Sequence, residues 1–281
     1  ATNAVTAVKI TDGTITAAKL ATGAIVLPIG YIGGLRLSND SDASHDVNIT
    51  AGAARDATNA QDIVLASEIT KRIDAAWAVG NDAGGLDGTE SVGGTPDAST
   101  LYYVWLILRS DTGVEDALFS ESATAPTMPT NYDYKRLIGC VKTDGSANIF
   151  AFTHRGDYFR YTGTNPVDVN DNTIASLTFE DGTLSCPANC LAHIYGGVAN
   201  SSESGTAGAL YIKTKGASEA AAYPTAWMET NNTSAFDELN REGTCLVDSA
   251  SEIQYAALEA AGTATVNIVS IGFWMLTRSD P

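Results

Sequence analysis

The sequence contains no run of about 18 consecutive apolar residues, the length that a membrane-spanning helix requires. Its longest apolar stretch, residues 104–108, has only the length of a strand. No basic segment followed by an apolar segment opens the chain, so we expect no signal peptide. Charged residues are also few, at 17% of the 281 residues. We therefore expect neither insertion into a membrane nor a targeting segment.

Positive charge is scarce. The chain has 16 Lys and Arg against 33 Asp and Glu, which gives a formal net charge of −17. A surface of that sign repels DNA, RNA and anionic lipid. We therefore expect no nucleic-acid partner and no contact with a membrane surface.

Cysteine is too infrequent for a disulfide scaffold, with four in the chain. Cys186 and Cys190 are separated by three residues, and His193 follows them closely. This spacing leaves open unpaired structural cysteines, a local disulfide and a metal site. Zinc requires a fourth ligand with a recognisable partner spacing, and the sequence shows none. We therefore predict no metal site.

Motifs for nucleotide binding and nucleophilic catalysis are absent from the sequence. There is no GxxxxGK[ST] loop, no strand–GxGxxG–helix unit and no GxSxG turn. The histidines His45, His154 and His193 are far apart in the chain. Acidic pairs such as Glu180 and Asp181 lie in expected turns, where carboxylates cap backbone amides. We therefore predict no enzymatic activity and no cofactor.

Residues 168–173, DVNDNT, begin like a calcium-binding loop. The sixth position lacks the glycine of such a loop, and Phe179 stands where the bidentate glutamate belongs. We interpret the segment as an Asx-rich turn, with a weak calcium site as the alternative.

Short strands joined by tight turns dominate the rest of the pattern. Residues 101–109, LYYVWLILR, are the strongest predicted strand and end in a turn signal. Residues 264–274 alternate between apolar and polar for most of their length, as a half-buried strand does. Residues 68–77 fit either a helix or a strand, and we expect residues 80–96 to form a glycine-rich loop without an element. This pattern predicts antiparallel sandwiches or jelly rolls.

Residues 4–25 repeat with a period of ten. The string VTAVKITDG at residues 5–13 aligns with ITAAKLATG at residues 15–23, and Ile25 opens a third copy. One such unit buries too little apolar surface to offset its ordering entropy, so these repeats become stable by stacking on neighbours or identical chains. We interpret the segment as an ordered stalk, with a flexible linker as the alternative.

The predicted domains follow from these patterns. A proline and a cluster of glycines at residues 28–34 end the repeat. We predict a repeat stalk at residues 1–27, a β-domain at 28–159 and a distal β-sandwich domain at 160–281. The predicted fold class is mainly β, with two antiparallel sandwich or jelly-roll-like domains after a short stalk.

Residues 223–236 set three aromatic residues among Thr, Asn and Glu. Aromatic faces stack on sugar rings, and neighbouring amides supply hydrogen bonds to hydroxyls. The candidate glycan contacts are Tyr223, Trp227, Asn231 and Asn232. The alternative is that Trp227 caps the core of the sandwich.

Two segments resemble phage proteins. The string ITAAKLATGAI at residues 15–25 resembles the repeats that precede the globular ends of phage tail fibres. Residues 100–157 resemble a module common in structural fibre proteins of phages and prophages. The residues that carry this second resemblance are TLYYVWLI at 100–107, FS at 119–120, Pro126, Pro129, YKRLIG at 134–139 and FTHRGD at 152–157.

The resemblance covers residues 1–160 and implies a homotrimeric virion fibre with a host-surface role. We expect the apolar residues of the repeat to lie against the trimer axis. The expected partners are identical chains, other virion proteins at the N-terminal end and a host surface glycan or protein. Because residue 1 is Ala rather than Met, we expect residues 1–27 to be the end of a longer shaft. The predicted axis residues are Val5, Ile10, Ile15, Leu20 and Ile25.

The leading functional prediction is therefore a structural virion fibre protein that mediates host attachment, located in the extracellular particle after assembly in the bacterial cytoplasm. The alternative is a capsid, neck or tail decoration or connector that binds no receptor. A polysaccharide depolymerase is a third class, and it would demand a long parallel β-helix that this turn-rich sequence lacks.

Overall fold

The computed structural model describes residues 26–88, 94–174, 178–200, 208–217, 226–230, 238–258 and 264–276. Every regular element within these ranges is a β-strand, which confirms the mainly-β prediction. No helix in these ranges is long and apolar enough to cross a membrane. The strands are β1 Ile32–Gly34, β2 Leu37–Asn39, β3 Asp46–Ile49, β4 Gly52–Arg55, β5 Asp62–Leu65, β6 Ile69–Ala76, β7 Ala83–Leu86, β8 Leu101–Arg109, β9 Glu115–Ser120, β10 Tyr132–Lys142, β11 Phe152–Arg155, β12 Tyr158–Tyr161, β13 Val167–Ile174, β14 Glu180–Thr183, β15 Leu191–Asn200, β16 Gly208–Thr214, β17 Ala226–Thr230, β18 Glu238–Leu246, β19 Glu252–Leu258 and β20 Ala264–Trp274.

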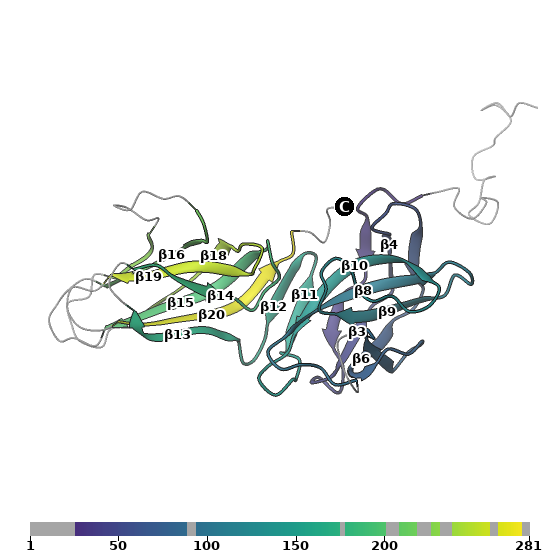
Figure 1. Ribbon diagram of the computed structural model, residues 1–281, viewed down its shortest axis with the longest axis horizontal. Helices are drawn as coiled ribbons and strands as arrows, with labels where there is room; N and C mark the ends of the chain where they lie inside the picture. Colours follow the sequence, from purple (N-terminus) through teal and green to yellow (C-terminus); the bar gives the residue numbers. More distant parts are fainter. Residues whose placement is uncertain are drawn as a thin grey trace, which may run out of the picture.

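These strands form three sheets in an elongated molecule with two lobes, an N-terminal lobe that contains β1 to β10 and a C-terminal lobe that contains β13 to β20 (Figure 1). The largest sheet runs in the order β10-β8-β9-β7-β6-β3-β2-β11-β12-β20-β15-β18, with β13 also paired to β20. A sheet in the order β1-β4-β5 belongs to the N-terminal lobe. The sheet β14-β19-β16-β17 lies beside β20, β15 and β18 in the C-terminal lobe, in a β-sandwich-like arrangement (Figure 1).

Strand β8 confirms the strongest prediction from sequence. It pairs with β10 on one edge and with β9 on the other, and its seven central residues are all buried. A strand that is covered on both faces has no solvent side, so its sequence reads as a continuous apolar run instead of an alternation. The LYYVWLILR segment thus forms the centre of the N-terminal lobe.

The glycine-rich segment at residues 80–96 corrects an expectation, because it contains strand β7. The backbone of β7 runs parallel to β6, and Gly84 pairs with Arg72. A Cβ atom on Gly84 would lie 2.0 Å from the carbonyl oxygen of Ala76, so strands β6 and β7 approach each other more closely than a side chain allows. Gly84, one of the glycines that indicated a loop, is therefore required by the close packing of β7 against β6. The neighbouring residues 68–77, which fitted either a helix or a strand, contain strand β6.

The calcium-like segment at residues 168–173 also differs from the expectation. It lies within β13 and pairs with β20, so the predicted Asx-rich turn is wrong. The Asp168 carboxylate accepts hydrogen bonds from the hydroxyls of Ser185 (2.7 Å) and Ser270 (2.5 Å). Pairing with a distant strand overrides the local turn preference of Asp and Asn.

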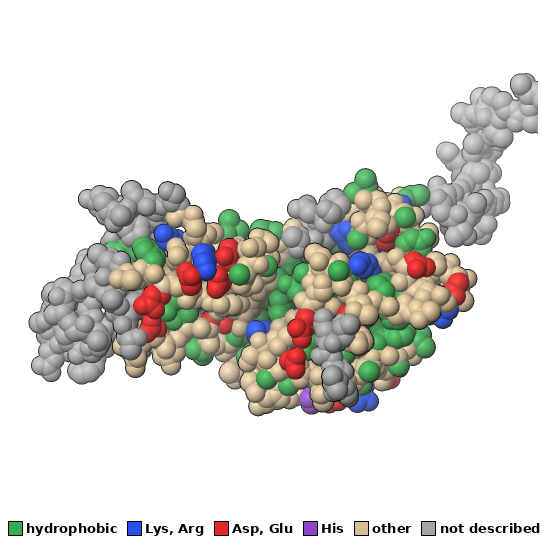
Figure 2. All heavy atoms as spheres, viewed as in Figure 1, with side chains coloured by type: hydrophobic (Ala, Val, Ile, Leu, Met, Phe, Trp, Pro, Cys, Tyr) green, Lys and Arg blue, Asp and Glu red, His purple; other side chains and the backbone are tan. Residues whose placement is uncertain are grey.

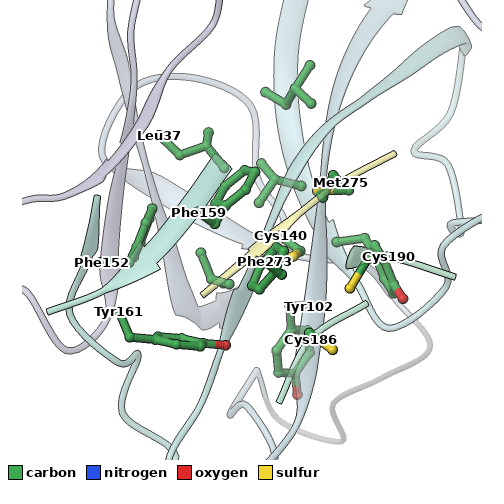
Figure 3. Close-up of a cluster of buried hydrophobic side chains, with 14 of the residues drawn as sticks. Leu37, Tyr102, Cys140, Phe152, Phe159, Tyr161, Cys186, Cys190, Phe273 and Met275 are labelled. Carbon is green, nitrogen blue, oxygen red and sulfur yellow. The ribbon is translucent and has the colours of Figure 1, made fainter. Parts of the chain in front are cut away.

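A shared core lies at the waist where β11 and β12 join the two lobes (Figures 1 and 3). Phe159 on β12 stacks on Phe273 on β20, with ring centroids 5.2 Å apart. Leu37 and Cys140 reach this cluster from the N-terminal lobe, and Cys190 reaches it from the C-terminal lobe (Figure 3). Apolar packing and the largest sheet are therefore continuous across the waist, while the domain boundaries at residues 27/28 and 159/160 stay predictions.

The predicted stalk falls almost wholly outside the described residues, which begin at residue 26. All five predicted axis residues lie outside them: Val5, Ile10, Ile15, Leu20 and Ile25. The stalk and the trimer therefore stay predictions.

Candidate functional site

The glycan contacts predicted from sequence lie mostly outside the described residues. Tyr223, Asn231 and Asn232 fall in undescribed segments. The backbone of Trp227 belongs to β17, and its side chain is not described. The candidate site therefore comes from another part of the C-terminal lobe.

Four neighbouring strands, β12, β20, β15 and β18, turn one face toward solvent. Their register aligns side chains in three rows across the strands, since residues directly opposite each other in antiparallel strands share a face. We call this set the outer face. Its rows are Tyr158, Trp274, Leu191 and Leu246; Arg160, Gly272, His193 and Thr244; and Val269, Tyr195 and Glu242.

The alternation of side chains along each strand produces this face. Phe159, Phe273 and Ala192 point to the opposite side and are buried in the core. Their sequence neighbours must then point outward, because successive side chains in a strand alternate between faces. Outward-facing Tyr195 and Leu246 remain 39% and 49% exposed, so large apolar surface on this face contacts water.

Aromatic rings in the first two rows pack against one another. Tyr158 stacks on Trp274 with a centroid distance of 4.3 Å and an angle of 26° between the rings. The His193 ring lies 5.6 Å from Trp274. Cross-strand aromatic pairs of this kind contribute about 0.5–1.5 kcal/mol beyond the area that they bury, so they stiffen this part of the sheet.

A chain of hydrogen-bonding groups crosses the same face. The Tyr158 hydroxyl lies 2.7 Å from His193 Nδ1, and His193 Nε2 lies 3.1 Å from Glu242 Oε1. Burial lowers the pKa of His193, with a further decrease from Arg160 and an opposing increase from Glu242. The neutral imidazole therefore fits best with Tyr158 donating to Nδ1 and with the Nε2 hydrogen directed at the Glu242 carboxylate. This arrangement orients the Glu242 side chain.

A hollow of about 400 Å³ adjoins the third row. Tyr195 offers an exposed ring there, while Arg160, Asn165 and Glu242 bring a guanidinium, an amide and a carboxylate. An apolar ring surrounded by donors and acceptors suits a ligand that has both apolar faces and hydroxyl groups. The remaining lining residues are Val269 and Ile271.

A second hollow, of about 390 Å³, is lined from both sides of the waist, by residues of the N-terminal lobe and by residues 187–189. Hydrophobic side chains gather at the waist in Figure 2. The two aromatic residues that line this hollow, Tyr103 and Trp105, are only 8% and 3% exposed, and the Lys135 ammonium lies over the Trp105 ring. These rings have little free face for a ligand, so this hollow does not suit stacking on a sugar.

The other histidines have structural surroundings. His154 is buried, stacks on Phe159 at 3.9 Å and accepts a hydrogen bond at Nδ1 from the Leu37 amide at 3.0 Å. His45 lies on the surface beside Asp42, at 3.1 Å. Of the three histidines, only His193 belongs to the outer face.

The candidate cysteine and acidic pairs also have structural contacts. Cys186 and Cys190 are free and buried, and their mutual hydrogen bond and burial raise the pKa of Cys186 well above its ordinary value. Asp181 forms an ion pair with Lys215 at 2.7 Å, and Glu180 contacts Asp171, so that burial and this neighbour raise the pKa of Glu180. Within the described ranges, no three His, Cys, Asp or Glu side chains are grouped to bind a metal ion.

No protein-family model matches the chain, and no curated protein is significantly similar to it.

Sequence reasoning missed the outer face. The alternation in YFRY at residues 158–161 and in HIY at residues 193–195 indicates which side chains share a side of their own strand. It does not indicate that β20 lies between these two strands, because β20 is far away in the sequence. Only the pairing of distant strands brings Tyr158, His193 and Glu242 together.

Proposed function

We propose that this chain is a structural virion fibre protein that attaches the particle to a glycan on the host cell surface, and that the outer face binds the glycan. The observation that carries the proposal is the exposed Tyr195 ring beside the charged and amide groups of one hollow. An aromatic ring stacks on the apolar face of a sugar while carboxylate and guanidinium groups hydrogen-bond its hydroxyls. Tyr195 supplies the ring, and Glu242 and Arg160 supply the polar contacts.

The proposed role is binding without catalysis. Glycoside hydrolysis uses two carboxyl groups that flank the scissile bond. Among the described residues that line the hollow, Glu242 is the single carboxylate, and it also contacts His193. These contacts support a fixed hydrogen-bond acceptor and offer no pair of acids.

The decapeptide repeat supports a fibre with several copies of the site. In the proposed homotrimer, residues 1–27 form the stalk, other virion proteins bind its N-terminal end, and the two β-rich regions at 28–159 and 160–281 lie beyond it. Three linked sites convert weak single contacts into firm attachment, because the second and third contacts form at a high effective concentration. A shallow, partly exposed hollow that binds a single glycan weakly is therefore sufficient for attachment when three copies bind together.

The test is binding of the intact chain to an array of purified bacterial surface polysaccharides, followed by titration of the best-bound polysaccharide. We expect Tyr195→Ala to weaken binding about tenfold, which corresponds to the loss of about 1.4 kcal/mol of binding free energy. Glu242→Gln should weaken it as well, since the amide loses the negative charge and one acceptor position.

The matched control is Tyr31→Ala. Tyr31 is 40% exposed, similar to Tyr195, and directly precedes β1 in the N-terminal lobe. This control should bind like the wild type. Equal affinities for wild type and Tyr195→Ala, or no binding of wild type to any surface polysaccharide, would contradict the proposal.

A further inference from the structure

The N-terminal lobe contains a fully buried pair of opposite charges. Lys71 on β6 and Asp116 on β9 are 0% and 1% exposed at their side chains, and Nζ lies 3.1 Å from Oδ1. Strand β7 lies between β6 and β9 in the sheet, so the pair connects two strands that are not hydrogen-bonded to each other. Removing two charges from water costs desolvation free energy, which their mutual attraction often does not offset. A fully buried ion pair therefore requires an explanation.

The contacts of Lys71 orient its amine toward Asp116. Nζ donates one hydrogen bond to the carbonyl oxygen of Ala78 (2.7 Å) and one to that of Gly80 (3.2 Å). The third hydrogen is left for the Asp116 carboxylate. Once that proton moves to the carboxylate, the lone pair of the nitrogen points at the carboxyl group, while the two carbonyls keep the amine in place.

The Asp116 carboxyl group is held by backbone amides. The Gly80 N–H donates to Oδ2 at 2.8 Å, and the Ala117 N–H donates to Oδ1 at 2.6 Å. A backbone N–H aimed at a carboxyl oxygen stabilises the negative charge that develops there when a nucleophile adds to the carbon. The Gly80 amide is placed to do so at Oδ2.

Aromatic side chains surround the pair. The Trp77 ring lies 5.6 Å from Lys71 Nζ, and Tyr132 packs against Trp77 at 5.3 Å in a T-shaped arrangement. The Tyr132 hydroxyl is buried without a hydrogen-bond partner among the described residues, and burial, then Asp116, raise its pKa to about 12. The surroundings are thus apolar and dry, which favours the uncharged form of the lysine amine.

The chemistry of a neutral amine against a neutral carboxyl group in this setting is condensation. Burial lowers the pKa of Lys71, although Asp116 opposes the shift, and an uncharged lysine amine is a nucleophile. Fixed contact of two groups corresponds to effective molarities of about 10⁵–10⁸ M, which favours a bond that dilute reactants in water would not form. Condensation also removes both buried charges.

We propose that Lys71 and Asp116 form an intramolecular amide bond that cross-links β6 to β9. A proton passes from Nζ to Oδ1, and the Nζ lone pair then attacks Cγ, which leaves negative charge on Oδ2 beside the Gly80 N–H. A second proton passes from Nζ to the Oδ1 hydroxyl, the Cγ–Oδ1 bond breaks, and one water leaves. No oxidant or reductant takes part, and the bond is independent of glycan binding.

The test is mass spectrometry of the full-length protein under denaturing conditions. We expect a mass below the sequence mass by one water, about 18 Da. Trypsin does not cleave after an acylated lysine, so the digest should contain a branched peptide that joins the regions of Lys71 and Asp116. Fragmentation must place the link at these two residues, because Asp–Gly sequences such as Asp144–Gly145 can also lose water by forming a succinimide.

The chain supplies its own control. Lys215 lies 2.5 Å from Glu252, but these side chains are 30% and 24% exposed, and the pKa of Lys215 is raised by its hydrogen bonds to Asp181 and Glu252. This charged, hydrated pair should remain unlinked in the same digest. The variant Lys71→Met should show the mass of its sequence, and the wild-type digest decides the question even if this variant does not fold. Wild-type protein at its full sequence mass, with tryptic cleavage after Lys71, would overturn the proposal.

Discussion

The Tyr158 hydroxyl lies 2.7 Å from His193 Nδ1, although strand β20 separates the strands of these two residues. The residue of β20 in the row of His193 is Gly272, which pairs with Arg160 on one side and with His193 on the other. A Cβ atom at Gly272 would meet the backbone of β12 at Phe159 and Arg160, so the absence of a side chain there lets β12 and β20 lie close together. The Tyr158–His193 contact crosses the sheet beside this close approach of the two strands.

The first prediction concerns the titration of His193. Because burial and Arg160 lower its pKa despite Glu242, we expect an NMR titration midpoint below the ordinary value of 6.5. The unfolded chain then binds more protons than the folded chain just below pH 6.5, so stability rises with pH in that window. The contribution of His193 is complete above 6.5 and is lost as the pH falls through the lower folded value.

The measurement for this prediction is the melting temperature between about pH 7 and pH 5, for wild type and for His193→Gln. The difference between the two proteins should shrink or change sign toward the acidic end, since the glutamine does not titrate. A midpoint above 6.5, with wild type gaining stability over the variant on acidification, would show that Glu242 outweighs burial.

The second prediction concerns Gly272. A Cβ atom there would lie 2.2 Å from the carbonyl oxygen of Phe159 and 3.0 Å from the Cα atom of Arg160, and neither is a flexible side-chain end. We expect Gly272→Ala to push β12 and β20 apart and to destabilise the protein by about 1–3 kcal/mol in urea unfolding.

The control for Gly272 is Gly145→Ala, because a Cβ atom on Gly145 meets nothing within 4 Å. This substitution should leave the free energy of unfolding unchanged or raise it by about 0.4–1 kcal/mol through the unfolded state. Equal unfolding midpoints for the two alanine variants would show that the close approach at Gly272 carries no cost.

The third prediction concerns assembly. If the decapeptide repeat is a trimeric stalk, light scattering of the intact chain gives the mass of three chains. We expect Ile15→Asp to lower the measured mass, because a charge buried at the trimer axis loses its solvation. Thr16→Asp is the control at an adjacent position that we place away from the axis. A monomeric mass for the intact chain would exclude the trimer.

The periodicity of apolar residues was sufficient to predict a strand wherever that strand keeps the same environment along its length. The segment LYYVWLILR became β8 because a strand buried on both faces needs an unbroken apolar run, and that requirement is visible in the sequence itself. The alternation in residues 264–274 became β20 for the complementary reason, since one face of that strand is buried and the other is not. The mainly-β class followed from many such segments.

The tertiary structure decided everything that depends on which strands meet and in what register. Gly84 reads as a loop residue until β6 passes close to it, and Asp168 reads as a turn residue until β20 pairs with its strand. The contact of Tyr158 with His193 and the pair of Lys71 with Asp116 likewise join residues from strands that are not paired with each other. Sequence patterns report the environment of a residue along its own strand, whereas sites are made by the order and register of strands, which no local pattern encodes.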